Sequence, residues 1–494
     1  MNGLRQFPLG HTITGNPHSV CVSLPTAADV FGYEEKDPRV LGALATGYPR
    51  FLEHPLISRL TALVRARLGL GEGTLLLCAS VAVAADVLQY AGAGRPLGGL
   101  PQGLAGVFFE ATAAPAALRR AQAFLQHTGG RISSREAEAT LVALGELSRP
   151  HPEDRLESKD ERPLLEAFAS QVGTAPENLR LTRGGMNAVH AAFRALSHLA
   201  SREGRHRWVQ VGWLYVDTIR ILSDLCPPGV APIVCSEAAD FAALARAVRA
   251  SAGEIAGIVV EAPTNPTFGL PDLRALRALA DEVGAFLIVD PSLVGISNAQ
   301  VLPFADVVVA SQTKYAAGRG DVMAGLLAIN PHSRVALELP ALLERWITPL
   351  HAADRARLLA ELKANEGLVA RVNETLPEVA RFLEAHPAVE RVRWARPSPA
   401  ADWLRGPGAV VSFTVRGDPR RFFDRLEMAK GPSFGTAYSL LSPYVWLAHY
   451  DLVKSVEGRD SLTRAGVPPD LMRLSVGRES PEAIIAALEG ALAC

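Results

Sequence analysis

The 494-residue sequence predicts an α/β fold with a mostly parallel central sheet and helices on both faces. Three short apolar runs support this prediction, at residues 255–261, 285–290 and 306–314. Runs that are apolar throughout and rich in β-branched residues are typical of strands buried on both faces. Between the first two runs, residues 270–284 place apolar side chains at helical spacing and end on a glycine, which suits a helix C-terminus. The stretch therefore predicts a β-α-β unit.

Polar residues follow these strands where a ligand would lie. Asn265, Asp290 and Lys314 each come at or just after a strand end, and ligands of such sheets sit beyond the carboxyl ends of the strands. Only six lysines occur in the chain, and Lys314 alone follows directly on a buried strand. A desolvated amine has a lowered pKa and acts as a nucleophile, so Lys314 is the candidate for covalent chemistry.

Composition and cysteine content indicate which binding partners and which cellular compartment to expect. The net charge of −1, with 48% hydrophobic and 20% charged residues, gives no electrostatic reason to expect nucleic acid or a membrane. Five scattered cysteines without a C-x-x-C pair favour a reduced compartment, with neither a disulfide framework nor a metal site. The N-terminus lacks the apolar core of a signal peptide, and the longest apolar run is too short to span a membrane. We expect a cytoplasmic enzyme acting on small molecules.

The beginning of the chain is expected to form an arm and an insertion. Residues 1–70 contain several Pro and Gly turns and one convincing helix, at 56–68, so the segment should lie on a core or on a neighbouring subunit. Residues 71–165 hold two strand-then-helix patterns and a further helix, without a catalytic signature. They form part of a large domain that we place at residues 71–350.

The rest of that domain carries two further binding signals. The Gly-Gly turn before Met186 opens a helix, and glycines there let a phosphate approach backbone N–H groups. Tyr215 ends a strand, where an aromatic ring either stacks on a planar ligand or belongs to the core. Residues 351–494 begin with long helices and continue with alternating strands and helices, which predicts a smaller C-terminal α+β domain.

Taken together, the strand-end residues fit one cofactor. Lys314 can form a Schiff base with an aldehyde, and Asp290 can keep a pyridine nitrogen protonated. Ser311 and Thr313 lie three residues and one residue before Lys314, where their hydroxyls could hold a phosphate.

Three segments resemble the γ-family of pyridoxal-phosphate enzymes, the Cys/Met metabolism group: 262–266, 311–325 and 473–477. Further motifs are similar to the long, fungal-type cystathionine γ-synthases. These are residues 17–25, 32–35, 47–51, 126–135, 214–218 and 447–450.

The resemblance implies a fold-type I transferase, a homo-oligomer that is a dimer or a dimer of dimers, and a role for each site residue. Lys314 would hold the cofactor and move protons, Asp290 would pair with the ring nitrogen, Tyr215 would stack on the ring, and Asn265 would contact the phenolic oxygen. The phosphate would be held by backbone N–H groups of Gly185 and Met186, by Ser311 and Thr313, and by Tyr48 and Arg50 from the neighbouring subunit. Arg473 would bind the substrate carboxylate, with Ser433 beside it.

The sequence departs from the family pattern in several places. Gly184 replaces a serine at the phosphate turn, and Arg319 stands where a histidine is usual. Pro432 occupies the position before Ser433 where some relatives carry a substrate-selecting glutamate. Residues 71–165 are an insertion relative to the short bacterial members.

The implied reaction is γ-replacement on an O-acyl-homoserine with cysteine, which forms cystathionine in transsulfuration and methionine biosynthesis. O-acyl-homoserine sulfhydrylation and methionine γ-lyase-type elimination remain alternatives, as does a non-catalytic scaffold. Residues 311–314 also match the S-x-x-K pattern of serine acyltransferases, but the S-D-N and K-T-G elements of that class do not occur.

Overall fold

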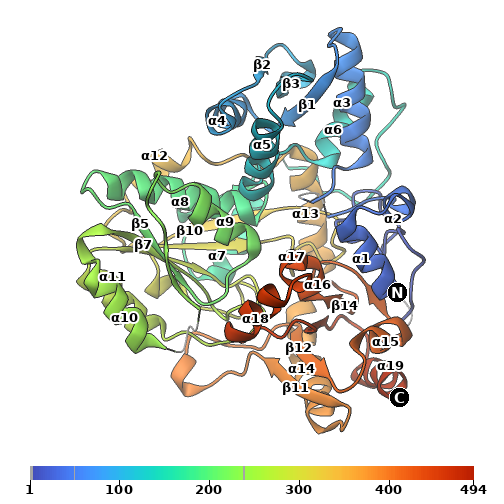
Figure 1. The fold of residues 1–494 in the computed structure, drawn as a ribbon, viewed down its shortest axis with the longest axis vertical. Coiled ribbons are helices and arrows are strands. Elements are labelled where there is room, and N and C mark those ends of the chain that lie inside the picture. Colours follow the sequence, from blue (N-terminus) through green and yellow to red (C-terminus); the bar gives the residue numbers. More distant parts are fainter. Residues whose placement is uncertain (1–3, 49–50, 159, 237–239, 494) are drawn as a thin grey trace.

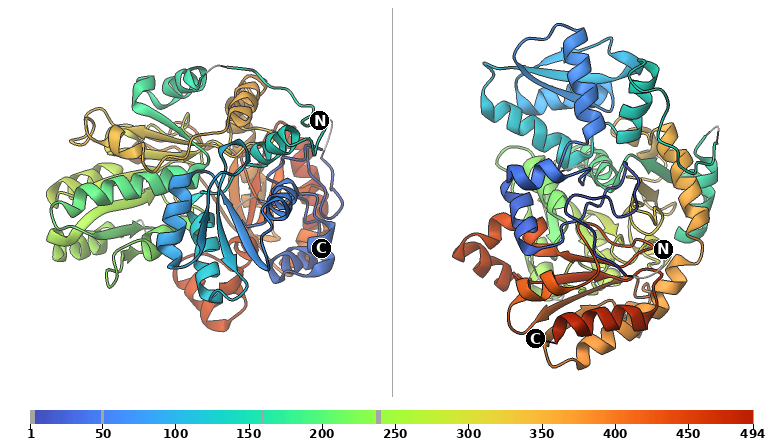
Figure 2. Two further views of the ribbon diagram at one scale, coloured as in Figure 1. Left: turned by 90° about the horizontal axis from the view of Figure 1, so that it is seen from above. Right: turned by 90° about the vertical axis from the view of Figure 1, so that its right-hand side faces the viewer.

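The computed structural model describes residues 4–48, 51–158, 160–236 and 240–493. Three sheets follow one another through the molecule, as the two perpendicular views show: a small sheet at one end, a large central sheet, and the C-terminal sheet at the other end (Figures 1 and 2). None of the helices in the described part of the chain has the length and apolar composition that a bilayer crossing requires.

The central sheet has the strand order β4-β10-β9-β8-β7-β5-β6. Strands β9, β8, β7, β5 and β6 pair in parallel, whereas β10 is antiparallel to both of its neighbours. The predicted mostly parallel α/β sheet is therefore confirmed. The strands are β4 (Leu179–Thr182), β5 (Arg207–Val211), β6 (Ile233–Cys235), β7 (Ile255–Glu261), β8 (Phe286–Asp290), β9 (Val307–Ser311) and β10 (Gly325–Ile329).

Alternate residues of the central strands face two separate cores. On β8, Leu287 and Val289 pack into the core that includes α11, while Phe286 and Ile288 pack into the core that includes α8. A strand that is apolar on both faces is buried between two helical layers, which explains its continuous apolar sequence. The helices of this part are α7 (Arg162–Val172), α8 (Gly185–Ser201), α9 (Val216–Asp224), α10 (Phe241–Ala250), α11 (Leu273–Glu282) and α12 (Leu339–Leu343).

The C-terminal part contains a five-stranded sheet of order β11-β12-β15-β14-β13, antiparallel except for the β13–β14 pair. The strands are β11 (Val389–Trp394), β12 (Val410–Val415), β13 (Ala429–Lys430), β14 (Leu440–Pro443) and β15 (Met472–Ser475). The helices are α13 (Ala352–Ala364), α14 (Leu368–Ala385), α15 (Pro419–Arg425), α16 (Tyr444–Ala448), α17 (Tyr450–Val453), α18 (Val456–Arg464) and α19 (Pro481–Leu492).

The N-terminal segment packs on the core of its own chain. Backbone hydrogen bonds join Val20 N to Gly320 O (2.8 Å) and Leu24 N to Lys430 O (3.1 Å). The expectation of one helix before residue 70 is wrong, because α1 (Ala27–Glu35) and α2 (Pro38–Ala43) precede α3 (Pro55–Arg67). Thr26 caps α1 by accepting a hydrogen bond from Asp29 N, a local signal typical of a helix start.

Residues 73–143 form the small antiparallel sheet β1-β3-β2 with flanking helices. Arg135 joins this part to the segment between β9 and β10: its Nε lies 2.7 Å from Glu153 Oε1, and its Nη2 lies 3.5 Å from Asp321 Oδ1. The elements are β1 (Gly73–Cys78), β2 (Arg95–Leu97), β3 (Ala105–Glu110), α4 (Val81–Ala91), α5 (Pro115–Thr128) and α6 (Ser134–Ala143).

Candidate active site

Strands β4, β5, β7, β8 and β9 all end at one edge of the central sheet, because β4 runs in the same direction as β9 after two antiparallel steps. The segments that follow these strands line one pocket. The sequence-predicted residues of this edge come together there: Gly185, Met186, Tyr215, Asn265, Asp290, Ser311, Thr313 and Lys314. From the C-terminal part, Ser433 and Arg473 complete the pocket.

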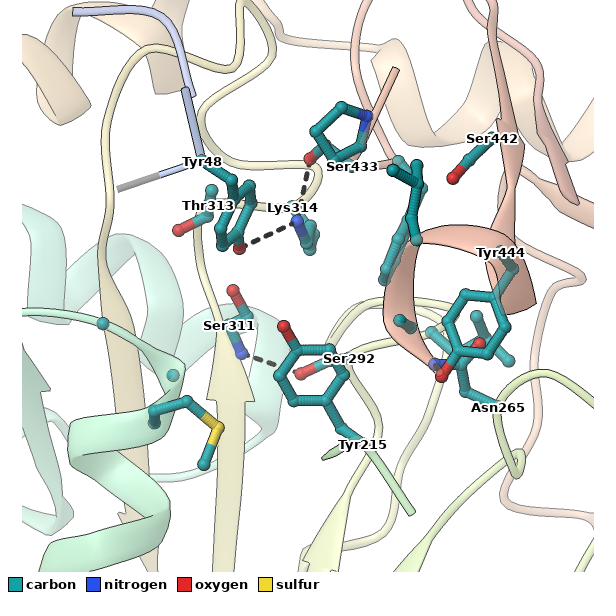
Figure 3. Close-up of a pocket in the computed structure, with 18 of the residues that line it drawn as sticks. Tyr48, Tyr215, Asn265, Ser292, Ser311, Thr313, Lys314, Ser433, Ser442 and Tyr444 are labelled. Carbon is teal, nitrogen blue, oxygen red and sulfur yellow. Dashed lines mark hydrogen bonds between the residues drawn. The ribbon is translucent and has the colours of Figure 1, made fainter. Parts of the chain in front are cut away.

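Lys314 lies in the middle of the pocket, on the loop that follows β9 (Figure 3). Its Nζ donates to Ser433 Oγ (2.8 Å) and to Tyr48 Oη (3.4 Å). The same nitrogen lies 4.9 Å from the centre of the Phe434 ring, and the side chain is buried. A buried amine held by two hydroxyl groups is well placed for nucleophilic and proton-transfer chemistry.

Asp290 ends β8 directly beside Glu261, which ends the parallel neighbour β7. Asp290 Oδ1 accepts a hydrogen bond from Ser292 N (2.8 Å), and burial raises the pKa of its carboxyl to about 6. Burial, followed by the charge of Asp290, raises the pKa of Glu261 as well. Sequence reasoning missed Glu261, although its position as the last residue of a predicted strand next to Asp290 was a usable signal.

Glu261 organises two of its neighbours through their backbones. Its carboxylate accepts hydrogen bonds from Tyr215 N (2.6 Å) and from Asn265 N (3.1 Å). Tyr215 is the N-cap residue of α9, and its ring lies in the pocket below Lys314 in the view of Figure 3. The two residues predicted to contact the cofactor ring are thus fixed by one buried side chain.

The turn from β4 into α8 forms one end of the pocket. The first helical bond from Asn187 N reaches Gly184 O (2.9 Å), so the N–H groups of Gly185 and Met186 precede it and point out of the helix end. A Cβ on Gly185 would meet Ser311 Cβ at 2.9 Å, which explains the glycine. The Thr313 hydroxyl is already bonded to the backbone of Ala324, from whose N–H it accepts (3.1 Å).

Arg473 lies at the opposite end of the pocket, on β15. Its guanidinium group is placed between two rings, 4.5 Å from the centre of Tyr444 and 4.9 Å from that of Phe434. Nη1 donates to Asn265 Oδ1 (3.1 Å), and Nε has no hydrogen-bond partner among the described residues. A buried guanidinium group with donor capacity to spare suits a carboxylate ligand.

Tyr48 reaches the pocket of its own chain. The resemblance implies that this residue comes from a neighbouring subunit, whereas the structure brings Tyr48 and Lys314 of one chain within 3.4 Å. Arg50, the other predicted residue of that motif, lies outside the described residues.

The model of the Cys/Met metabolism PLP-dependent enzyme family matches residues 161–493. The chain belongs to this family. Its members depend on pyridoxal phosphate, so the chain is an enzyme of this cofactor class and the predicted recognition is confirmed.

Relatives of this family differ in what their names say they do. An L-2-amino-4-chloropent-4-enoate dechlorinase/desaturase of Streptantibioticus cattleyicolor is 36% identical over 480 residues, covering 96% of this chain and 95% of its own. A cystathionine γ-synthase of Neurospora crassa is 32% identical, over 63% of this chain and 51% of its own. The solved cystathionine γ-synthase of Xanthomonas oryzae pv. oryzae, in complex with cystathionine, has a TM-score of 0.58 and 27% identity, over 68% of this chain and 86% of its own.

The pocket fits the family's cofactor. Asp290 and Glu261 place two buried carboxyl groups side by side at the pocket, and burial raises the pKa of both, so a cation bound beside them would favour the ionised form. A protonated pyridine nitrogen supplies that cation. At the far side, the helix N-terminus at Gly185 and Met186 provides the backbone donors that a phosphate needs.

Proposed function

We propose that the enzyme removes a small leaving group from the γ-carbon of an L-α-amino acid, as an elimination that increases unsaturation. The Streptantibioticus relative supports this reaction, because it resembles the chain along nearly its full length and its name states a dechlorination coupled to desaturation. In 2-amino-4-chloropent-4-enoate the chlorine is on C4, which is the γ-carbon. The ester oxygen of an O-acyl-homoserine is bonded to the same carbon.

The charges of the pocket are the observation that favours elimination over replacement by cysteine. Among the described residues that line it, the cationic side chains are Lys314 and Arg473. Lys314 is assigned to the cofactor, which leaves Arg473 for one carboxylate. Cysteine as second substrate would bring a second carboxylate, and so would a succinyl ester. Glu34 also lines the pocket, and although burial raises its pKa to about 7, its ionised form would repel that group.

Each site residue has a task in this proposal. When bound, pyridoxal phosphate supplies an aldehyde that condenses with amines and a ring that accepts electrons. Asp290 would keep the ring nitrogen protonated, and Tyr215 would lie against the ring. Gly185, Met186 and Ser311 would hold the phosphate with N–H and hydroxyl donors.

The substrate is bound and deprotonated by other residues. Arg473 binds its carboxylate in a bidentate pair, and Asn265 keeps the guanidinium group oriented. The Lys314 amine takes the proton from Cα, and Ser433 Oγ, 2.8 Å from Nζ, holds the amine in place between proton transfers. The rings of Phe434 and Tyr444 exclude water around the guanidinium group of Arg473, which strengthens the attraction of this group for a carboxylate.

Cystathionine formation is the second candidate. The Neurospora crassa and Xanthomonas oryzae pv. oryzae proteins support it through their names and their resemblance to 63% and 68% of the chain, respectively. Replacement by sulfide is a variant of this candidate. Because sulfide has no carboxylate, it would not need a second cationic side chain.

The test is to incubate the holoenzyme with three substrates: L-2-amino-4-chloropent-4-enoate, O-acetyl-homoserine and O-succinyl-homoserine. Each is offered alone, with cysteine and with sulfide, and products are separated by mass. We expect chloride release and a product lighter by HCl without any nucleophile, and faster turnover of the acetyl than of the succinyl ester. Turnover only when cysteine is present, with cystathionine as product, would replace the proposal by the second candidate.

A further inference from the structure

One wall of the pocket takes no part in the proton transfer or in cofactor and carboxylate binding described above. It is formed by Tyr33 and Glu34 of α1 and by Leu447 and Ala448 of α16. These residues belong to two sequence motifs, 32–35 and 447–450, that lie more than four hundred positions apart in the chain. The Phe31 ring packs 5.2 Å from that of Trp446 and so joins the two helices.

This wall is the part of the pocket that is left for the substrate side chain. Other lining residues are already assigned to the phosphate, to the cofactor ring and to the substrate carboxylate. Helix α16 begins at Tyr444, which contacts Arg473, and reaches Leu447 about one turn later. A substrate held at Arg473 with its Cα at Lys314 would therefore have its γ-carbon available to this wall.

Tyr33 lines this wall, and its hydroxyl group is not used by the fold. The residue is only 2% exposed, and its Oη has no hydrogen-bond partner among the described residues. Buried hydroxyl groups are nearly always hydrogen-bonded, so an unpaired one that lines a substrate pocket points to a ligand atom. Burial raises the pKa of the Tyr33 hydroxyl, and the group stays protonated as a donor.

We propose that the Tyr33 hydroxyl donates a hydrogen bond to the leaving group on the γ-carbon and so determines which leaving groups the enzyme accepts. This inference rests on the proposed function. Lys314 takes the Cα proton and later returns it, while a Cβ–H bond breaks and its electron pair forms a new π bond between Cβ and Cγ. The C–Cl bond breaks with both of its electrons staying on chloride, and with the proton from Cβ the net loss is HCl. Tyr33 keeps its own proton throughout and stabilises the departing anion, which is a halide or the carboxylate of a neutral ester.

A binding experiment tests the inference without turnover. The holoenzyme is titrated with L-O-methylhomoserine and with L-norleucine, which has CH2 in place of the ether oxygen, and the cofactor absorbance reports binding. Methoxide is a poor leaving group, so the ether persists. We expect the wild type to bind the ether about 3- to 10-fold more tightly, as one neutral hydrogen bond allows. Tyr33→Phe should abolish or reverse this preference.

A kinetic experiment tests the role in bond breaking. Tyr33→Phe should lower kcat on the 4-chloro substrate by about 10- to 100-fold, the effect of losing one hydrogen bond to a charged group, and should lower it less on the 4-bromo analogue. Tyr450→Phe is the matched control, because Tyr450 donates to Glu35 at the same helix junction but does not line the pocket. It should behave as the wild type.

Two outcomes are separable. An equal ether preference in wild type and Tyr33→Phe, or no preference in the wild type, overturns the role of Tyr33 even if elimination occurs. Absence of elimination in the wild type overturns the proposed function, and the binding ratio still decides whether Tyr33 recognises an acceptor on the γ-carbon. Thermal unfolding of each variant shows whether a loss comes from misfolding.

Discussion

Arg473→Ala should weaken binding of every amino-acid substrate by a large and calculable factor. Arg473 is 6% exposed, and its guanidinium group lies over two rings and is bonded through one of its nitrogens to Asn265. Removing one partner of a buried, hydrogen-bonded charge pair costs about 2–5 kcal/mol. At 1.4 kcal/mol for each factor of ten, affinity should fall by roughly 30- to 3000-fold.

The assay must separate the lost ion pair from local damage. Binding of L-norleucine and of pentylamine, the same ligand without its carboxylate, is measured by cofactor absorbance in wild type and Arg473→Ala. The double difference isolates the coupling between guanidinium and carboxylate. We expect the variant to lose its preference for norleucine while its affinity for pentylamine stays within about threefold.

The control is Arg391→Ala, which removes an exposed arginine from β11 of the same sheet. It should leave both affinities unchanged. If Arg473→Ala weakens pentylamine and norleucine equally, or changes norleucine affinity by less than about threefold, the carboxylate clamp is assigned to the wrong residue.

Three further predictions concern the lysine, the arm and acid stability. Lys314→Ala should lose both the visible absorbance of the bound cofactor and turnover, and retained turnover would contradict its assignment. Because Tyr48 contacts Lys314 of its own chain, mixing inactive Lys314→Ala and Tyr48→Phe proteins should restore no activity; restoration, measured after refolding together, would place Tyr48 in the neighbouring subunit's site. Three buried histidines have lowered pKa values in the folded state and bind protons only on unfolding below pH 6.5, so their contribution to stability should fall by roughly 3–4 kcal/mol between pH 7 and pH 5.5. Because the raised pKa of the Asp290 and Glu261 carboxyls acts in the opposite direction, the histidine contribution is measured by comparing denaturant midpoints of the wild type and of a variant that lacks the three histidines. The same pH dependence in both proteins would refute it. Burial lowers the pKa of His54 and His449 to about 4 and that of His190 to about 3.

Local sequence rules predicted the parts of the site that lie at strand ends. Asp290 and Lys314 end neighbouring parallel segments, and the sheet rule alone brings them to one edge. The pairing of Arg473 with Asn265 joins residues 208 positions apart, and periodicity carries no information about such contacts. The family resemblance predicted a role for Arg473. Its hydrogen bond to Asn265 and its contacts with the Phe434 and Tyr444 rings depend on the three-dimensional packing and could be found only in the structure.

The arm was predicted less well for a physical reason. The apolar residues of α1 form no clear stripe, and its start is marked by a single Thr cap. Its stability comes from tertiary contacts, such as the bond from Ala27 N to Asp424 Oδ1 (2.7 Å) and the packing of Phe31 on Trp446. Tertiary packing outweighs weak intrinsic preference in a helix this short.

The register of two strands sets the electrostatics on which the proposed chemistry depends. Glu261 and Asp290 are cross-strand neighbours at the ends of β7 and β8, and a shift of one residue in either strand would turn its carboxyl group to the other face. The two carboxylate oxygens of Glu261 accept hydrogen bonds from the N–H groups of Tyr215 and Asn265, so Glu261 fixes the two residues predicted to contact the ring. Asp290 accepts a hydrogen bond from Ser292 N at Oδ1 and would pair with the ring nitrogen. Replacing Glu261 by Gln would therefore disturb ring placement, while replacing Asp290 by Asn would remove the charge that holds the ring protonated.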